Sequence, residues 1–269
     1  MKKILSMALI SIMLVLALAG CAAKTTPAGT DADLAIACEL TSEEYGIGFR
    51  KGSDLTAVVN GYMAELKEAG VLDELAAKYE LTLSDLAPAE EEEATLADVD
   101  YVKANGKLVI GITDYEPMNF KDAEDNWTGF DTEFALAVCE KLGVTAEFVE
   151  IDWDNKFVAL ESKAIDCIWN GMTISEDVLK NTSCSAAYVK NAQVVVMAAD
   201  KAADYADAAS MAELSFAVES GSAGAAAAEE NAFANVTEVG TQTDALLEVT
   251  SGSCDACIID LTMANAMVK

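Results

Sequence analysis

Apolar and polar positions alternate with two different periods along this chain, and the succession of these periods predicts a mixed α/β fold. Apolar residues in 55–67 recur every three or four positions, which is typical of an amphipathic helix. Residues 108–112 form a continuous apolar run, as expected for a buried strand. Further strands are predicted at 34–38, 147–151, 165–169, 193–198, 214–218 and 256–259, and further helices at 132–142, 155–162, 202–212 and 222–234. Strands that alternate with helices favour mostly parallel sheets.

The first residues have the pattern of an export signal. Lys2 and Lys3 precede an apolar run at 4–19, which is shorter than the ~20 residues that a membrane-spanning helix needs. The run ends in Leu-Ala-Gly-Cys, which resembles the lipobox of bacterial lipoproteins. We therefore predict that residues 1–20 are a signal peptide, that Cys21 is lipidated and that 21–33 form a flexible tether. An ordinary secreted protein with a chance cysteine is the alternative.

The charge balance is strongly acidic. The chain has 46 acidic and 17 basic residues, a formal net charge of −29, and it has no histidine. Such a chain repels nucleic acid and anionic lipid surfaces, although the charge also serves solubility. Without histidine the chain lacks the usual general base near neutral pH and the commonest metal ligand. We therefore predict a protein that is not an enzyme and that has no nucleic-acid partner, no metal site and no cofactor.

The chain has seven cysteines, and export would permit disulfides. Four of them, however, lie in apolar strand-like or helical surroundings, which favours small buried thiols: Cys38, Cys139, Cys167 and Cys257. Cys254 and Cys257 form a C-x-x-C pair that leads into a strand instead of opening a helix. A redox motif is the alternative for this pair.

Two aromatic residues follow predicted strands. Ligands in open α/β sheets collect at the carboxyl ends of strands. Tyr115 follows the strand at 108–112, and Trp153 follows the strand at 147–151. These rings either stack on a small ligand or are partly buried in the core.

Polar and small residues follow the next strands in the same way. Asn170, Gly171 and Thr173 come after the strand at 165–169, where the glycine would let a ligand approach the backbone. Ser222 precedes an Ala-rich helix, whose N-terminus presents free N–H groups to an anion. Asp260 ends an apolar strand, where it either binds an ammonium group or caps the following turn.

Several motifs together resemble the extracellular solute-binding proteins (family 3) of polar amino-acid ABC transporters. The family's opening segment is similar to residues 107–120, and further landmarks are similar to 127–133, 165–174 and 254–260. Residues 34–81 resemble the family's closing segment, yet they precede the opening segment. The order of segments therefore predicts a circular permutation.

The resemblance implies an α/β, two-lobe, periplasmic-binding-protein-like (type II) fold with a hinge. The two lobes would be connected near residues 45–49 and 188–193. The acidic stretch at 82–98 would join the ancestral termini, with an acidic binding patch as the alternative. The predicted division is 1–20 signal peptide, 21–33 tether, 34–44 strand of lobe II, 45–188 lobe I including the linker 82–98, and 189–269 lobe II.

The resemblance also assigns roles to the candidate residues. It implies that Tyr115 and Trp153 sandwich the ligand, and that Asp260 binds its ammonium group. The residues that would contact the α-amino and α-carboxylate groups are Gly171, Thr173 and Ser222.

One position departs from the family's pattern. Val178 stands where the family usually places an arginine that binds the carboxylate, and the chain's one arginine, Arg50, is expected at a surface strand end. Lys156 or Lys180 would then substitute as a point charge. Otherwise the helix N-terminus at Ser222 binds the anion, or the ligand is not an ordinary α-amino acid.

The implied function is that of an exported, lipid-anchored substrate-binding protein on the outer face of a bacterial membrane. It would capture a small polar solute, an amino acid above all, by hinge closure and deliver it to an ABC permease. A solute sensor of the same fold and a dehydratase-like enzyme are the alternatives.

Overall fold

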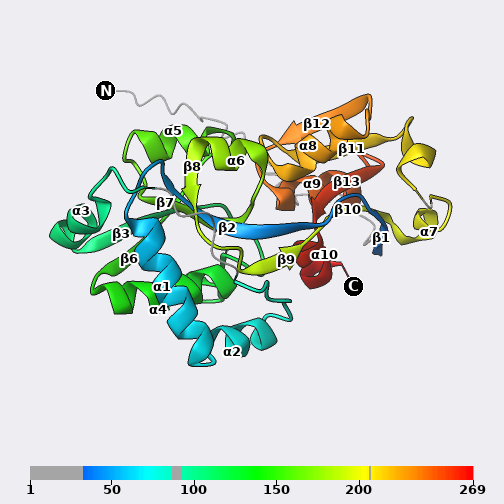
Figure 1. Cartoon of the computed structure of the whole chain (residues 1–269). Coiled ribbons are helices and arrows are strands. Elements are labelled where there is room, and N and C mark those ends of the chain that lie inside the picture. Colours follow the sequence, from blue (N-terminus) through cyan, green and yellow to red (C-terminus); the bar gives the residue numbers. More distant parts are fainter. Residues whose placement is uncertain (1–32, 87–92, 206, 269) are drawn as a thin grey trace, which may run out of the picture.

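The computed structural model describes residues 33–86, 93–205 and 207–268 (Figure 1). The predicted signal peptide, Cys21 and the tether up to residue 32 lie outside these residues, as does part of the acidic linker. Among the residues described, no helix is long and apolar enough to cross a membrane.

The first sheet lies in the lobe that carries β1 and the C-terminal elements (Figure 1). Its strands, in spatial order, are β1 (Leu34–Glu39), β10 (Gln193–Ala198), β13 (Ala256–Asp260), β11 (Ser215–Glu219) and β12 (Asn235–Val239). Three of these strands, β10, β13 and β11, have buried apolar side chains, whereas β1 and β12 form the two edges of the sheet. The helical segments of this lobe are α7 (Ala199–Ala202), η2 (Ala208–Met211), α8 (Ala223–Glu230), α9 (Gln242–Thr250) and α10 (Leu261–Met267).

Strand β1 joins this sheet although it is far from the other strands in sequence. It pairs antiparallel with β10, so that Leu34 lies opposite Ala198 and Glu39 opposite Val194. We expect residues 34–38 to form a strand in the same sheet as 194–196 or 256–259, and the sheet contains all three segments. The pairing is what a permuted order of segments requires, whereas the permutation itself stays a prediction.

The second sheet forms the core of the other lobe. Its path is β6 (Thr145–Glu150), β3 (Lys107–Ile112), β7 (Cys167–Thr173), β2 (Glu43–Arg50) and β8 (Thr182–Cys184), and β9 (Val189–Asn191) also pairs with β2. The short strands β4 (Phe120–Lys121) and β5 (Trp127–Thr128) pair with each other as a separate two-stranded sheet. The helices of this lobe are α1 (Leu55–Glu68), α2 (Val71–Lys78), α3 (Asp98–Asn105), α4 (Phe130–Leu142), η1 (Trp153–Asn155), α5 (Lys156–Glu161) and α6 (Glu176–Asn181).

Two strand segments connect the lobes (Figure 1). The start of β2 pairs with β9, and this ribbon leads from one sheet to the other. The prediction that residues 45–49 make the first connection is wrong, because Ile47 and Phe49 are fully buried within the second sheet. The connection lies instead between the end of β1 at Glu39 and the first residues of β2, Glu43 and Glu44, which pair with β9. The apolar residues of β2 alternate with Gly46 and Gly48, beside which Cys184 and Met172 pack closely.

Arg50 does not lie at a surface strand end, so that prediction is also wrong. Its side chain is only 6% exposed. Nε is 3.0 Å from Oδ2 of Asp98, Nη2 is 3.0 Å from Oδ1 of Asp166, and Nη1 donates to the carbonyl of Ile165 at 2.8 Å. Two carboxylates thus compensate a buried cation, which would otherwise be costly in the core.

The thiols are free and mostly buried. No disulfide joins the cysteines of the described chain. Burial raises the pKa of Cys139 to about 12, so this thiol stays protonated and unreactive. Cys38 departs from the prediction of a buried thiol because it is only partly buried.

Candidate functional site

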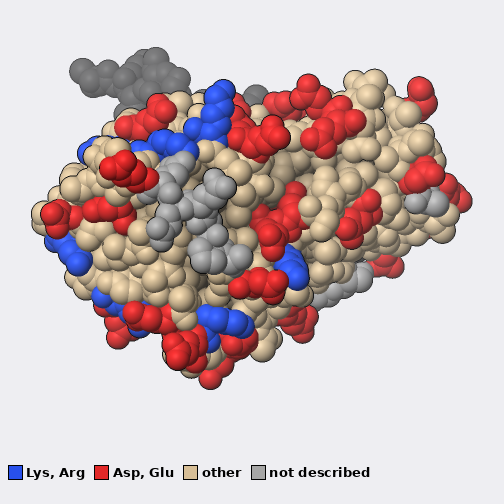
Figure 2. Space-filling view, in the orientation of Figure 1, with Lys and Arg blue, Asp and Glu red and all other residues tan. Residues whose placement is uncertain are grey.

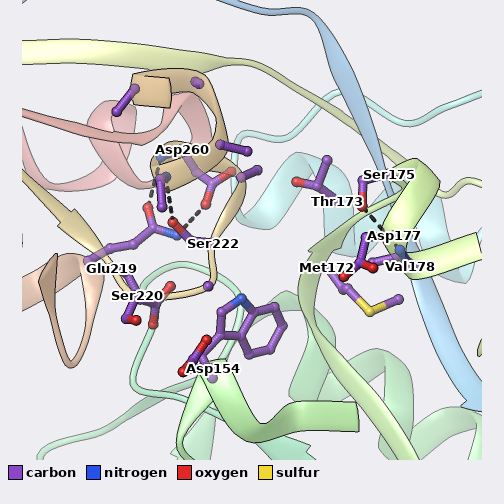
Figure 3. A pocket seen from close by; sticks show the side chains of 18 of the residues that line it. Asp154, Met172, Thr173, Ser175, Asp177, Val178, Glu219, Ser220, Ser222 and Asp260 are labelled. Carbon is purple, nitrogen blue, oxygen red and sulfur yellow. Dashed lines mark hydrogen bonds between the residues drawn. The ribbon is translucent and has the colours of Figure 1, made fainter. Parts of the chain in front are cut away.

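A cavity of about 720 Å³ lies between the two lobes. Both sheets contribute to its walls. All seven predicted site residues line it: Tyr115, Trp153, Asn170, Gly171, Thr173, Ser222 and Asp260. Their contact with a ligand stays a prediction, whereas their convergence on one cavity is a finding. Figure 3 shows Asp260, Ser222 and Glu219 on one side and Thr173, Asp177 and Val178 on the other.

Tyr115 connects the two lobes through its hydroxyl group. This hydroxyl lies 2.5 Å from that of Tyr45 and 2.6 Å from Oγ1 of Thr262, which belongs to α10 in the other lobe. Tyr45 and Thr262 are 2.9 Å apart, so the three hydroxyls form a closed triangle. With 2% of its surface exposed, Tyr115 can offer a ligand only a limited part of its ring.

Trp153 also lines the cavity and is largely buried. It opens the short helix η1, and 7% of its surface is exposed. The ammonium group of Lys156 lies 5.0 Å from the ring centroid. Stacking on a ligand and partial burial, the two interpretations from the sequence, are both compatible with this exposure.

Gly171 is required by close packing. Its φ is +56°, and a Cβ there would lie 2.6 Å from Cε1 of Tyr115. Its N–H donates to Oδ2 of Asp131 at 2.6 Å, so this backbone donor is already in use. The glycine therefore admits the Tyr115 ring and turns the strand end.

Asn170 and Thr173 are both hydrogen-bonded within the protein. Oδ1 of Asn170 accepts from the N–H and Oγ1 of Thr113, which positions the loop after β3. Oγ1 of Thr173 donates to Oε1 of Glu43 at 2.7 Å. These residues shape the cavity through neighbouring groups.

Asp260 has three amide donors around its buried carboxylate. Asn191 and Gln193 donate to Oδ1, and Gln242 donates to Oδ2. The side chain makes no capping bond to α10, which removes the capping interpretation. Burial and the nearby charge of Glu43 raise the pKa of Asp260 to about 7, against the opposing effect of these donors.

Glu219 was not predicted from the sequence. It ends β11, is 3% exposed and lines the cavity, and Oε1 has no hydrogen-bond partner within the described chain. Burial and the charge of Asp260 raise the pKa of Glu219 to about 8. The available signal was a carboxylate that ends an apolar strand, the same signal that identified Asp260.

Positive charge in the cavity comes from one lysine. Nζ of Lys156 donates to the carbonyl of Gly221 at 2.9 Å and to that of Trp153 at 3.2 Å. Burial lowers the pKa of Lys156, while Glu219, Asp154 and Asp177 oppose that effect.

Val178, at the position where the family usually has arginine, and Ser222, at the N-terminus of α8, lie on opposite walls of the cavity (Figure 3). Val178 lines the cavity with an apolar side chain, 4% exposed, whereas the exposed Lys180 does not line it. Ser222 caps α8 by accepting from the N–H of Ala225 at 3.1 Å. Of the two lysines expected to replace the arginine, only Lys156 is at the cavity.

Comparison with known proteins gives a family match over much of the chain. The model of the bacterial extracellular solute-binding proteins, family 3, matches residues 108–264. The L-cystine-binding protein TcyJ of Escherichia coli (strain K12) is 36% identical over 88 residues, which are 32% of this chain and 33% of TcyJ. This alignment therefore spans about a third of the relative's length.

Solved structures resemble the chain over a larger part. The ancestral amino acid-binding protein AncCDT-1, described as a precursor of cyclohexadienyl dehydratase, has a TM-score of 0.61 and 30% identity over 63% of this chain and 77% of that one. Arginine-bound, truncated ArgBP from T. maritima has a TM-score of 0.60 and 31% identity, over 63% and 80%. The two lobes thus have the predicted type II binding-protein fold.

Proposed function

Because the chain belongs to the bacterial extracellular solute-binding proteins, family 3, we propose that it captures a small polar solute between its two lobes. Binding would close the lobes about the ribbon of β2 and β9, and the closed form would be recognised by an ABC permease. The relatives named above are mainly binding proteins, which is consistent with a protein that is not an enzyme.

The cavity between the lobes carries this proposal. Residues of the second sheet and its loops, such as Thr173 and Trp153, face residues of the first sheet, such as Glu219 and Asp260, across it. A ligand that contacts both walls binds the closed form better than the open one, which is the differential affinity that closure requires.

A thermal-shift screen of amino acids, amines and short peptides tests the capture. We expect a small polar solute to raise the melting temperature, and small-angle scattering to show a decrease in radius of gyration on binding. A ligand that stabilises the protein without compaction would argue against hinge closure. Uptake of the radiolabelled solute by cells with and without the protein distinguishes an importer from a sensor.

The permuted order of segments belongs to the same proposal. The family match begins at residue 108, and β1 and β2 before it complete the two sheets. The segment at 34–81 would then be the displaced end of the ancestral chain. Lipidation of Cys21 would keep the captured solute near the permease.

An enzyme is the second candidate, because two cavity carboxyls have pKa values close to neutrality. Asp260 and Glu219 have pKa values of about 7 and about 8, a range suited to proton transfer. AncCDT-1, described as a precursor of a dehydratase, shares the fold. Turnover of a ligand found in the screen would favour this candidate.

A further inference from the structure

The charges around the cavity are more one-sided than the capture of a neutral or zwitterionic solute requires. Eight of the lining residues are Asp or Glu, and one, Lys156, is basic. Asp260 and Glu219 lie on one side of the cavity, and Asp177 lies on the opposite side beside Val178 (Figure 3). A ligand that spans the cavity therefore meets carboxylates at both ends.

One of these carboxylates has an unpartnered oxygen. Oε1 of Glu219 is buried at the cavity wall and has no hydrogen-bond partner among the described residues. A buried acceptor without a donor is destabilising, and for a charged group the cost is larger. An N–H donor on a bound ligand would satisfy this oxygen, and a cationic donor would satisfy it best.

The lining residues of the same cavity offer a carboxylate no uncommitted side-chain cation, which leaves only the N-terminus of α8 at Ser222 to bind one. Arg50 is bound to Asp98 and Asp166 in the core of lobe I, away from the cavity. The ammonium of Lys156 already donates to two backbone carbonyls. Beside Val178 a ligand carboxylate would find an apolar side chain and the negative charge of Asp177.

The lobe that carries Asp260 and Glu219 is strongly acidic as a whole. Between Gln193 and Val268 the sequence has twelve acidic residues and a single basic one, Lys201. On the face shown in Figure 2, basic residues gather mainly over the lobe of β3 and α1, and acidic residues dominate the other lobe. A field of one sign concentrates ligands of the opposite charge near the cavity.

We propose that the ligand is a linear dication without a carboxylate, an α,ω-diamine or its guanidino counterpart. One cationic end would lie at Asp260 and Glu219 and the other at Asp177, with the methylene chain between them. This inference rests on the proposed capture function and narrows its substrate class.

Calorimetry on the lipid-free mature protein tests the inference with ligand pairs that differ only by the α-carboxylate. Cadaverine is compared with lysine, and agmatine with arginine. We expect each amine to bind at least about tenfold more tightly than its amino acid, because one charge-assisted contact is worth roughly 1.5–3 kcal/mol. Equal or tighter binding of the amino acids would overturn the inference.

Two variants sharpen the comparison. Val178→Arg should lower the affinity for the amines and raise that for the amino acids by about tenfold or more. The new guanidinium could bind a ligand carboxylate through two hydrogen bonds beside Asp177. Asp177→Asn, at an exposed position, should weaken the amines by about tenfold and leave the amino acids unchanged or improved. Loss of both ligand types in Asp177→Asn, with an unchanged melting temperature, would contradict the assignment of Asp177 to the amine end.

The failure of this inference can be told apart from the failure of the proposed function. If an amino acid binds best and compacts the protein, capture stands and the dication is wrong. If no small polar solute in the screen binds, the capture function itself is wrong and the inference falls with it.

Discussion

Glu43 and Asp260 are held together by two amide groups that they share. Nε2 of Gln193 donates to Oε1 of Glu43 at 2.8 Å and to Oδ1 of Asp260 at 2.9 Å. Nδ2 of Asn191 donates to the same two oxygens. Glu43 begins β2 and Asp260 ends β13, so the pair joins the two sheets at the connecting ribbon.

This arrangement places two carboxylates on one set of donors with no cation between them. Burial and the like charge of Glu43 both disfavour ionisation of Asp260, whose pKa rises to about 7. A ligand ammonium at this point would relieve the repulsion and would contact residues on both sides of the hinge. A ligand ammonium would therefore favour closure of the lobes and neutralise the charge of Glu43 and Asp260 at the same point.

Replacing Asp260 by asparagine tests the ammonium contact directly. We expect Asp260→Asn to weaken a cationic ligand by about ten- to a hundredfold, since a charge-assisted hydrogen bond is worth roughly 1.5–3 kcal/mol. The melting temperature of the empty protein should change little, because the substitution also removes the repulsion between the carboxylates of Asp260 and Glu43. Asp100→Asn, an exposed change on α3, is the matched control for calorimetry. Unchanged affinity in Asp260→Asn would show that the ligand is held elsewhere.

The arginine of lobe I gives a prediction about stability. Arg50→Met leaves Asp98 and Asp166 buried without their cation, and breaking a buried pair in this way typically costs about 3–5 kcal/mol. Urea unfolding should show that loss, with little change for the exposed control Lys103→Met on α3, the helix that carries Asp98. Equal stability of Arg50→Met and the parent would mean that the two carboxyls take up protons on losing the arginine.

The sequence predicts most of the core strands because their apolar runs are continuous. Strand β12 was not predicted because it is an exposed edge strand with the sequence Asn-Val-Thr-Glu-Val, in which no apolar run exists. The error at Arg50 has a similar cause. Its burial comes from α3 and from the segment before β7, neither of which is near it in sequence.

The site was predicted from strand ends, and that signal has a limit. Strand ends identify which residues reach the cavity, and all seven do. They do not show which polar groups are already engaged: Asn170 is bonded to Thr113, and the N–H of Gly171 to Asp131. Glu43 was missed because its partners, Gln193 and Asp260, are distant in the sequence and meet it only through the fold.

The predicted lipid anchor at Cys21, a residue outside the described part of the chain, can be tested by substitution. Cys21→Ser should release the protein from membranes, because the predicted lipid is the attachment and the tether separates it from the fold. Fractionation followed by immunoblotting measures the release, and the thermal melt of the soluble variant should match that of the parent. Ser42→Cys, which leaves Cys21 intact, is a control for changes in thiol number. Membrane association that persists in Cys21→Ser would reject the lipobox.

The stability of the empty protein should fall as the pH rises. Asp131 and Asp260 have pKa values of about 7 in the folded protein, against an ordinary value of 3.8. For carboxyls with raised pKa values, stability is fully present below about pH 4 and is lost as the pH rises through about 7. Because one pKa unit corresponds to about 1.4 kcal/mol, each group contributes a few kcal/mol. Thermal melts at constant ionic strength should therefore show a lower melting temperature at pH 8 than at pH 5, and Asp131→Asn should reduce the difference.

Binding of a cation should have the opposite pH dependence. Burial and the charge of Glu43 raise the pKa of Asp260 to about 7. Burial and the charges of Asp260 and Asp244 raise the pKa of Glu219 to about 8, against the opposing charge of Lys156. Both carboxyls are therefore at least partly protonated at pH 7 in the empty site. A bound ammonium favours the ionised forms and therefore lowers both pKa values, which releases protons on binding. Affinity for a cationic ligand should rise by about ten- to a hundredfold between pH 6 and pH 8 and then level off, with at most about tenfold per pH unit from each group. Calorimetry in two buffers of different ionisation enthalpy measures the released protons at pH 7. In Asp260→Asn the release should be smaller, and a pH-independent affinity in the parent protein would exclude these carboxyls from the cation site.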